Sequence, residues 1–325
     1  MAGPSPCAVP AAGARPPANL AGMTDASTTP SDPSTPSGAS ARSGASAPGN
    51  AGYVDVRRIT VAGAPVAVVT LNRPDKLNGL TLGMLKDLAA ASRDLRGDRD
   101  LRAVILEGAG PSFSAGLDFA SALRSPTALG AAFVPGLDGV NVFQRACWGW
   151  RRVPVPVVAV VRGHCYGGGA QLALGADFRV TAPDARWSVM EAKWGLVPDM
   201  SGMRTLVDAV GADRAKRLAM TAEEFDGATA AEWGLATDVS DVPRARAEQI
   251  IAELVTRSPD QLAAAKRLTL DASRSPRAVF RRERIEQIAL LARENTARAR
   301  KAAFSKGREV ASFARRGTWA GRGDD

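Results

Sequence analysis

Two carboxylates in an apolar stretch are the side chains of this sequence best suited to proton transfer. Glu191 and Asp199 lie eight residues apart in the segment SVMEAKWGLVPDMSG. Burial would raise the pKa of either carboxyl and make it a usable general acid or base near neutral pH. Two plainer interpretations stay open. Glu191 could pair with Lys193 or Arg204. Asp199 could cap a helix that begins near Ser201.

A run of three glycines is the second feature that could take part in chemistry. Gly167–Gly169 precede an apolar run in HCYGGGAQLALGAD, and neither G-x-G-x-x-G nor G-x-x-x-x-G-K-[ST] is present, so the run is no recognised phosphate cradle. At the start of a helix, free backbone N–H groups and the helix dipole favour negative charge, including a transient oxyanion. The loop Ser112–Asp118 (SFSAGLD) could offer a second such N–H. The alternative is tight helix–strand packing that excludes side chains.

Composition limits the other kinds of site. The 325 residues include one histidine, His164, and three distant cysteines. A single histidine nearly excludes a His-ligated metal cluster, and a Ser–His triad would lack its G-x-S-x-G elbow. The sparse cysteines indicate a reducing compartment without a disulfide framework. We interpret His164 and Cys165 as packing residues.

Charge and hydropathy narrow the choice of partners. The net charge is +9, and residues 281–325 carry +6 of it. A basic end suits an anionic partner, and without a zinc-finger or RNP motif a phosphorylated small molecule ranks before nucleic acid. A solvated, arginine-rich helix face is the alternative. No apolar run reaches the roughly 20 residues that a membrane span needs.

The chain divides into three predicted regions. Residues 1–52 are rich in Ala, Pro, Ser, Gly and Thr and are predicted to be a disordered tail without a signal sequence. Met23 is an alternative start, which N-terminal sequencing would test. Residues 53–242 are predicted to be an α/β core, and residues 243–325 a helical C-terminal region.

Periodicity places the main elements. Fully apolar strands separated by helices predict a mainly parallel sheet that is covered on both faces. The predicted strands are Val66–Leu71, Ala103–Leu106, Pro156–Val161 and Phe178–Thr181, and the predicted helices are Thr81–Leu95, Pro243–Arg257, Pro259–Ala272 and Pro276–Lys306.

Four segments, in order, resemble the signatures of the crotonase (enoyl-CoA hydratase/isomerase) superfamily. They are LNRPDKLNGL (71–80), FSAGLD (113–118), GGGAQLALGADFRV (167–180) and MEAKWGLVPDMSG (190–202), and the resemblance runs from Val54 to Arg316. It implies a crotonase-like spiral of ββα units, with a helical C-terminal region that builds trimers or hexamers. It also implies an acyl-CoA thioester substrate, in which coenzyme A is part of the substrate and no separate cofactor is needed. We expect a cytoplasmic enzyme with no membrane or nucleic-acid partner.

The resemblance assigns roles residue by residue. It makes the backbone N–H groups of Leu117 and Gly168 the donors to the thioester oxygen. Glu191 matches the glutamate that hydratases and many isomerases share. Gln171 stands where hydratases carry a second glutamate and dienoyl-CoA isomerases an aspartate. Asp199 stands where dienoyl-CoA isomerases carry their second acid/base.

The mixture of residues favours isomerase chemistry. An amide can orient a water molecule but cannot take its proton, so Gln171 suits hydration poorly. Glu191, alone or with Asp199, can remove a proton at one carbon and return it at another. A 2-enoyl-CoA hydratase is the alternative. A catalytically weak crotonase-like protein that binds RNA or acyl-CoA is an alternative of another class.

The resemblance also indicates contacts with coenzyme A. The candidates are Arg73, Lys76, Leu77, Ala115, Asp118 and Lys306. Family members often carry a lysine where this chain has Ala120, so one phosphate contact is expected to be missing. The basic C-terminal segment could supply a replacement.

Overall fold

The computed structural model describes residues 52–305, 308 and 310–318. The predicted tail, apart from residue 52, and the predicted coenzyme A contact Lys306 lie outside these residues. Among the helices that are described, none has both the length and the apolar content to cross a bilayer.

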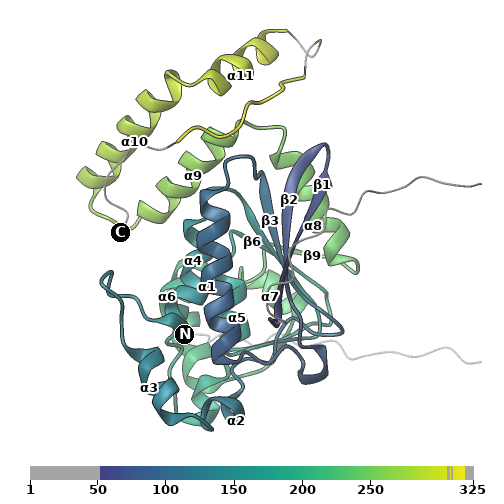
Figure 1. Ribbon diagram of the computed structural model, residues 1–325, viewed down its shortest axis with the longest axis vertical. Helices are drawn as coiled ribbons and strands as arrows, with labels where there is room; N and C mark the ends of the chain where they lie inside the picture. Colours follow the sequence, from purple (N-terminus) through teal and green to yellow (C-terminus); the bar gives the residue numbers. More distant parts are fainter. Residues whose placement is uncertain (1–51, 306–307, 309, 319–325) are drawn as a thin grey trace, which may run out of the picture. The chain divides into compact units, whose positions relative to one another are not determined.

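Six strands form the main sheet in the order β1-β2-β3-β4-β6-β9 (Figure 1). A hairpin joins β1 and β2, and all other neighbours pair in parallel. The predicted mainly parallel sheet is therefore confirmed. The strands are β1 Val54–Val61, β2 Ala64–Leu71, β3 Ala103–Gly108, β4 Val157–Val161, β6 Phe178–Thr181 and β9 Asp238–Val239.

A second sheet of three short strands was not predicted. It contains β5 (His164–Tyr166), β7 (Arg186–Ser188) and β8 (Phe225–Asp226) in the order β5-β7-β8. Strands of two or three residues are too short to show an alternating pattern. This sheet matters for the site because β5 ends immediately before the three glycines.

Helices cover both faces of the main sheet at its central strands, which explains why β2, β3 and β4 are largely apolar and buried. Val69 and Leu106 belong to one core cluster, which includes residues of α1 (Leu82–Gly97), α4 (Val142–Arg152) and α5 (Gly168–Leu174). Their chain neighbours Val68 and Ile105 belong to the other cluster, with Ala247 and Ile251 of α8 (Pro243–Leu254). Successive side chains of a strand point to opposite faces, so burial on both faces needs a continuous apolar run.

Side-chain caps begin two of the central helices. Thr81 Oγ1 accepts a hydrogen bond from Met84 N (3.2 Å) at the start of α1, close to the predicted beginning of that helix. Asn141 and Gln144 form a reciprocal capping box at the start of α4. The remaining helices of this region are α2 Phe119–Ala122, α3 Pro126–Phe133, α6 Gly202–Thr221 and α7 Gly227–Glu232.

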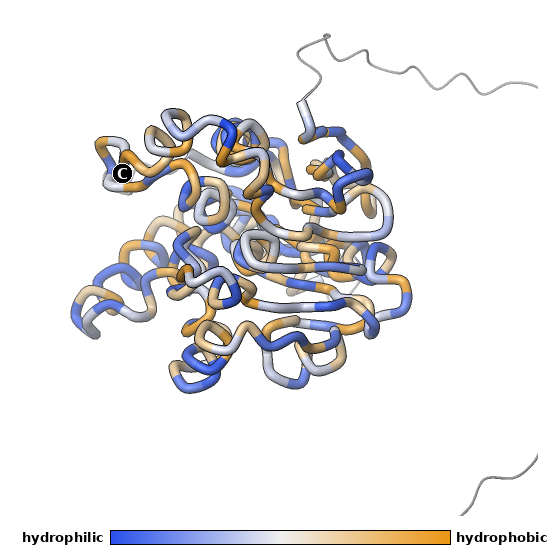
Figure 2. The backbone as a smooth tube through the Cα atoms, turned by 90° about the horizontal axis from the view of Figure 1, so that it is seen from below, coloured by the Kyte–Doolittle hydropathy of each residue, from blue (hydrophilic) through white to orange (hydrophobic). Residues whose placement is uncertain are grey.

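Three helices close the described chain: α9 (Pro259–Asp271), α10 (Pro276–Leu291) and α11 (Glu294–Phe304). The single helix predicted over Pro276–Lys306 is wrong, because the chain turns between α10 and α11. Buried Asn295 holds the start of α11 after this turn: its amide nitrogen donates to Asp260 (2.7 Å) and its amide oxygen accepts from Ala314 N (2.9 Å). Helices at the periphery of Figure 2 alternate orange and blue, as expected for helices with one apolar face.

Candidate active site

A cavity of about 680 Å³ brings together the residues that the sequence singled out. Leu117, Gly168, Glu191 and Asp199 all lie on its wall. Most of its other lining side chains are apolar. A concave, largely apolar cavity with a few convergent polar groups is the usual form of a small-molecule site.

Two backbone N–H groups lie side by side on this wall. A β-carbon built on Gly168 would be 3.6 Å from the nitrogen of Leu117. Leu80 bonds to the carbonyl of Gly116 and the N–H of Asp118, which leaves the intervening N–H of Leu117 unused. Within the described residues, neither Leu117 N nor Gly168 N donates a backbone hydrogen bond. Such a pair can bind an oxygen that gains negative charge.

The three glycines serve different purposes. Gly167 precedes α5 with a φ of 47°, in the region that favours glycine. A β-carbon on Gly169 would lie only 2.7 Å from the β-carbon of Ser114. Tight packing against the backbone therefore applies to Gly169, whereas Gly168 lies on the cavity wall, with the side chain of Met200 as its nearest neighbour.

A polar framework holds the first loop in place. Ser114 Oγ donates to the carbonyl of Asn78 (2.8 Å) and accepts from Gly116 N (3.2 Å). The Asn78 amide donates to the carbonyls of Ala109 (2.9 Å) and Ser112 (2.8 Å). These bonds fix the backbone that presents Leu117.

Glu191 is buried, and one of its oxygens is free. Its Oε1 accepts a hydrogen bond of 2.5 Å from the amide of Gln171, whereas Oε2 is buried without a partner among the described atoms. The alternative interpretation, a pairing of Glu191 with Lys193 or Arg204, does not fit this geometry: the partner of Glu191 is Gln171, and Arg204 pairs with Asp208 (3.0 Å). Burial raises the pKa of Glu191, and the nearby charge of Asp199 adds to this effect.

Asp199 does not cap a helix. Helix α6 begins at Gly202, and its N-terminal residue Ser201 provides no side-chain cap. The carboxyl of Asp199 instead lies on the cavity wall, where part of it stays exposed. Partial burial still raises the pKa of Asp199. The two carboxyls of the apolar segment therefore share one cavity.

Gln171 lies behind this wall rather than on it. It is 1% exposed on α5 and does not line the cavity. Its Oε1 accepts from the backbone N–H groups of Met200 (2.8 Å) and Gly202 (3.0 Å). These partners were not predicted, because they depend on how α6 packs against α5.

Of the predicted coenzyme A contacts that the structure describes, Ala115 lines the cavity and Arg73, Lys76, Leu77 and Asp118 do not. Arg73 is bonded to Asp118 (2.7 Å) and to the carbonyl of Gly79 (3.0 Å). Burial alone would raise the pKa of Asp118. The hydrogen bond from Ser121 N and the ion pair with Arg73 outweigh burial and hold this pKa below its usual value.

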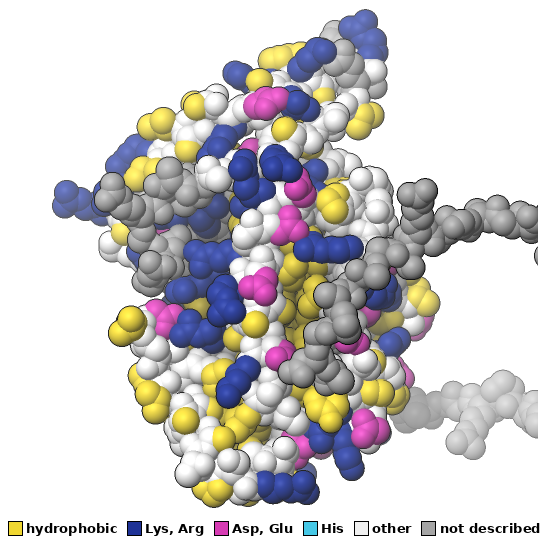
Figure 3. All heavy atoms as spheres, in the orientation of Figure 1, with side chains coloured by type: hydrophobic (Ala, Val, Ile, Leu, Met, Phe, Trp, Pro, Cys, Tyr) yellow, Lys and Arg dark blue, Asp and Glu magenta, His cyan; other side chains and the backbone are white. Residues whose placement is uncertain are grey.

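The other two contacts of the same loop are arranged differently. Lys76 is exposed, and the carbonyl of Leu77 accepts from Ala115 N (2.9 Å). Figure 3 shows dark blue Lys and Arg side chains on the C-terminal helices, so the predicted basic region is at the surface. Within the described part of the chain, no group of three His, Cys, Asp or Glu side chains could hold a metal ion.

Sequence reasoning missed the residues that shape the far wall of the cavity. They come from α2, α3 and α4 and include Leu129, Phe133 and Phe143. Phe133 and Phe143 stack with ring centres 4.8 Å apart, and Phe119 approaches Trp194 at 5.9 Å. The large apolar residues spaced along FASALRSPTALGAAF were the available signal.

Comparison with known proteins agrees with this arrangement. The enoyl-CoA hydratase/isomerase family model matches residues 62–313, and the chain belongs to this family. The short-chain-enoyl-CoA hydratase of Clostridium acetobutylicum is 34% identical over 197 residues, which cover 60% of this chain and 73% of that protein. The 1,2-epoxyphenylacetyl-CoA isomerase of Escherichia coli is 34% identical over 176 residues, covering 54% and 66%.

Solved structures show the same fold. A Thermobifida fusca protein, determined in complex with acetoacetyl-CoA, is 33% identical with a TM-score of 0.65 and covers 74% of this chain and 95% of that chain. The enoyl-CoA hydratase of Bacillus anthracis has a TM-score of 0.71 at 22% identity and covers 80% and 98%, a likeness of fold alone. The predicted crotonase-like fold, with its helical C-terminal region, is therefore confirmed.

Proposed function

We propose that this member of the family moves a double bond in an enoyl- or dienoyl-CoA thioester, with Glu191 as the base. The observation that carries this proposal is the free, buried Oε2 of Glu191 on the wall of the cavity that also holds two unused N–H groups. A raised carboxyl pKa keeps proton removal and proton return both accessible near neutral pH.

The reaction needs no group that the chain lacks. The carboxylate of Glu191 takes a proton from the saturated carbon next to the thioester carbonyl. The C–H electron pair forms the new C=C bond of the enolate, and the carbonyl π electrons move onto the oxygen. The N–H groups of Leu117 and Gly168 stabilise that enolate. Glu191 or Asp199 then returns one proton at another carbon, so the product is an isomer of the substrate.

Gln171 favours isomerisation over hydration. Hydration is served best by two carboxylates around one water molecule, but Gln171 is an amide and lies outside the cavity lining. A 2-enoyl-CoA hydratase is the second candidate, because relatives such as that of Clostridium acetobutylicum are named hydratases. In that case Glu191 and Asp199 would hold the water between them.

A comparison of three substrates separates these candidates. Purified protein is assayed with 2-enoyl-CoA, 3-enoyl-CoA and 3,5-dienoyl-CoA thioesters of equal length, and products are identified by mass. We expect double-bond movement with the last two substrates, and its loss in Glu191→Gln although acyl-CoA still binds. Hydration alone would refute the isomerase assignment.

Asp199→Asn refines the assignment. It should reduce dienoyl isomerisation far more than any hydration, because only the former needs a second proton donor at a distant carbon. Equal effects on both reactions would remove Asp199 from proton transfer.

The family resemblance further supports self-association as a trimer or hexamer, which we also propose. Phe280, Ile288 and Leu291 of α10 are each more than half exposed, with Ile288 at 69%. Apolar side chains gathered on one helix suit a subunit contact. Light scattering on wild type and Ile288→Arg would test this, since a monomeric wild type contradicts it.

A further inference from the structure

The orientation of the Gln171 amide is determined by its surroundings. Two backbone N–H groups, of Met200 and Gly202, point at one atom of the amide. That atom must be the oxygen, because an amide nitrogen cannot accept hydrogen bonds. The nitrogen therefore faces Glu191 and donates to its Oε1 at 2.5 Å.

Gln171 is also held rigidly in its seat. A β-carbon on Gly202 would lie 2.3 Å from Gln171 Oε1, so only a glycine leaves room for the amide at this position. Thr205 Oγ1 donates to the carbonyls of Ser201 (3.2 Å) and Gly202 (3.1 Å) and holds the first turn of α6. The amide cannot rotate without losing both backbone bonds.

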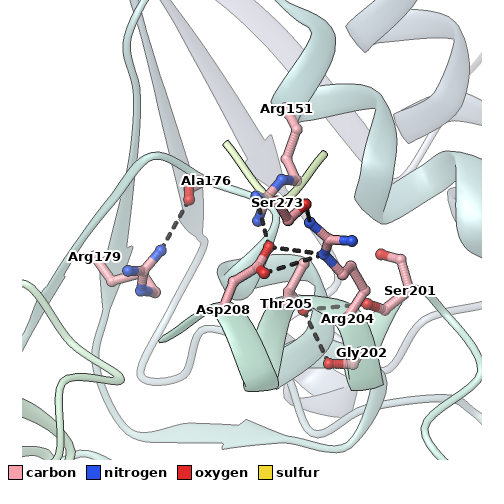
Figure 4. Close-up of polar contacts among 9 residues, drawn as sticks. All are labelled: Arg151, Ala176, Arg179, Ser201, Gly202, Arg204, Thr205, Asp208 and Ser273. Carbon is pink, nitrogen blue, oxygen red and sulfur yellow. Dashed lines mark hydrogen bonds and ion pairs between the residues drawn. The ribbon is translucent and has the colours of Figure 1, made fainter. Parts of the chain in front are cut away.

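Further polar contacts hold the same helix, as Figure 4 shows. Asp208 of α6 accepts hydrogen bonds from Arg151 of α4 (3.1 Å) and from Arg204 (3.0 Å). Arg204 also donates to Ser273, which follows α9. The N–H groups that hold Gln171 thus lie at the start of a helix that is tied to two other parts of the chain, α4 and the segment after α9.

We propose that Gln171 is a positioning residue that holds Oε1 of Glu191, so that Oε2 is the only oxygen of this carboxyl that exchanges protons with the substrate. The proposal rests on the function assigned to Glu191 above and concerns the control of that residue. Gln171 touches no substrate, because it does not line the cavity. It acts through the rotamer and the proton affinity of Glu191.

Burial is the largest influence on the pKa of Glu191 and raises it, as does the charge of Asp199, while hydrogen bonds from the backbone of Glu191 itself and from Gln171 lower it. Helix α5 contributes no charged side chain around Glu191, and Lys193 lies on the cavity wall with it. Burial, followed by the charges of Asp199 and Glu191, raises the pKa of the Cys147 thiol of α4.

Tyr166 of β5 is the remaining titratable group on the cavity wall, and its hydroxyl donates to Glu224 (2.8 Å). Burial and this hydrogen bond raise the pKa of Tyr166 to about 12. Neither Cys147 nor Tyr166 is therefore expected to change charge in the pH range in which Glu191 titrates.

A purely structural role is the competing interpretation, in which Gln171 only caps α6. Gln171→Glu separates the two roles. The new carboxylate would still accept from Met200 N and Gly202 N, and a negative charge at a helix start is favourable. It would, however, replace the donor to Glu191 by an oxygen 2.5 Å away, so the two carboxyls would have to share a proton.

The test uses a saturated acyl-CoA dissolved in D₂O. The hydrogen on the carbon next to the thioester carbonyl exchanges with deuterium, and mass spectrometry measures the exchange rate at a series of pH values. This exchange needs Glu191 and the two N–H groups but no double bond. We expect Gln171→Met to reduce the maximal rate between about 10-fold and 100-fold, as loss of a hydrogen bond to a charged group implies. The acidic limb of the pH–rate profile of Gln171→Met should move to higher pH. The exchange rate of the wild type should reach a plateau as the pH rises. In Gln171→Glu the pH–rate profile should instead be bell-shaped, and the rate should decrease at the pH at which the shared proton is lost.

Gly202→Ala offers a second, indirect variant. Its methyl group would push the Gln171 amide out of its seat without changing Gln171 itself, so it should shift the acidic limb in the same direction as Gln171→Met. Gln261→Glu, on the exposed side of α9, is the matched control and should leave the profile unchanged.

An infrared titration of the Glu191 carboxyl, assigned by its absence in Glu191→Gln, provides a readout that needs no turnover. Profiles and titrations of Gln171→Met and Gln171→Glu that coincide with those of the wild type would overturn the proposal and leave Gln171 as a helix cap. A wild type without proton exchange would refute the proposed function instead, and the infrared titration would then decide the role of Gln171.

Discussion

Glu191 and Asp199 line the same cavity, and burial raises the pKa of both carboxyls. A raised pKa has a consequence for stability as well as for catalysis. Between the unfolded pKa of Glu191, 4.5, and its higher folded pKa, the native state keeps a proton that the unfolded chain has lost. The free energy of unfolding therefore decreases as the pH rises through this window.

Glu191→Gln should remove this decrease in the free energy of unfolding, because glutamine does not ionise. We expect the variant to match the wild type near pH 4 and to become more stable than the wild type as the pH approaches about 7. Urea denaturation at several pH values measures the difference. Glu232→Gln, at the exposed end of α7, is the control and should show no divergence. A constant difference between Glu191→Gln and wild type would contradict the raised pKa.

Gly168→Ala tests the two N–H groups. The added methyl group would lie 2.9 Å from Met200 Sδ and 3.6 Å from Leu117 N, within the space that the thioester oxygen needs. We expect kcat/KM to fall about 100-fold, the effect of losing one oxyanion donor, with little change in Tm. Gly97→Ala, at the end of α1 with no atom near the new β-carbon, should leave activity unchanged. Full activity in Gly168→Ala would exclude this wall as the oxyanion site.

The sequence was most informative where one physical pattern determines one element. Strands β2 and β3 are largely apolar because both faces are covered, and they were predicted within a few residues. The break between α10 and α11 was missed because the start of α11 is held by contacts of Asn295 with Asp260 and Ala314, distant in the chain. A local sequence pattern does not indicate contacts between residues that are distant in the chain.

At the site, too, some residues could be predicted from local sequence and others could not. Glu191 and Asp199 stand out because a carboxylate in an apolar segment is unusual, and four ordered motifs supplied the expected positions of the N–H groups. The role of Gln171 depends on Met200 and Gly202, because only their N–H groups show that its amide oxygen faces α6 and its nitrogen faces Glu191. The far wall of the cavity likewise combines three helices that no motif connects.

That far wall predicts a preference for long or bulky apolar acyl groups. Each buried methylene is worth about 0.8 kcal/mol, so kcat/KM should rise about fourfold per carbon while the chain still fills the cavity. Ala122 is 2% exposed and lines the cavity. Ala122→Phe should therefore lower kcat/KM for decenoyl-CoA at least tenfold and leave crotonyl-CoA nearly unchanged.

Ala128→Phe, on the exposed side of α3, is the matched control for this experiment. Kinetics with acyl-CoA thioesters of increasing length give the comparison. An equal loss for short and long substrates in Ala122→Phe would show that the acyl group does not occupy this wall.

A largely buried lysine joins α9 to α4 and to the segments before β4 and β6, and its removal should destabilise the fold. Lys266 of α9 donates to Asp177 (2.6 Å) and to the carbonyls of Trp150 (3.0 Å) and Val155 (3.1 Å). Burial lowers the pKa of Lys266, and the charge of Asp177 acts against this. Lys266→Met would leave a carboxylate and two carbonyls without this donor, at a cost of about 3 kcal/mol in the free energy of unfolding.

Lys86→Met, at an exposed position of α1, is the control and should change the free energy of unfolding by less than about 0.5 kcal/mol. The double variant Lys266→Met/Asp177→Asn should recover part of the loss, because it removes the uncompensated charge. Chemical denaturation of the four proteins gives the comparison. If Lys266→Met and Lys86→Met were equally stable, the ion pair would not be what holds α9 in place, and apolar contacts alone would have to do so.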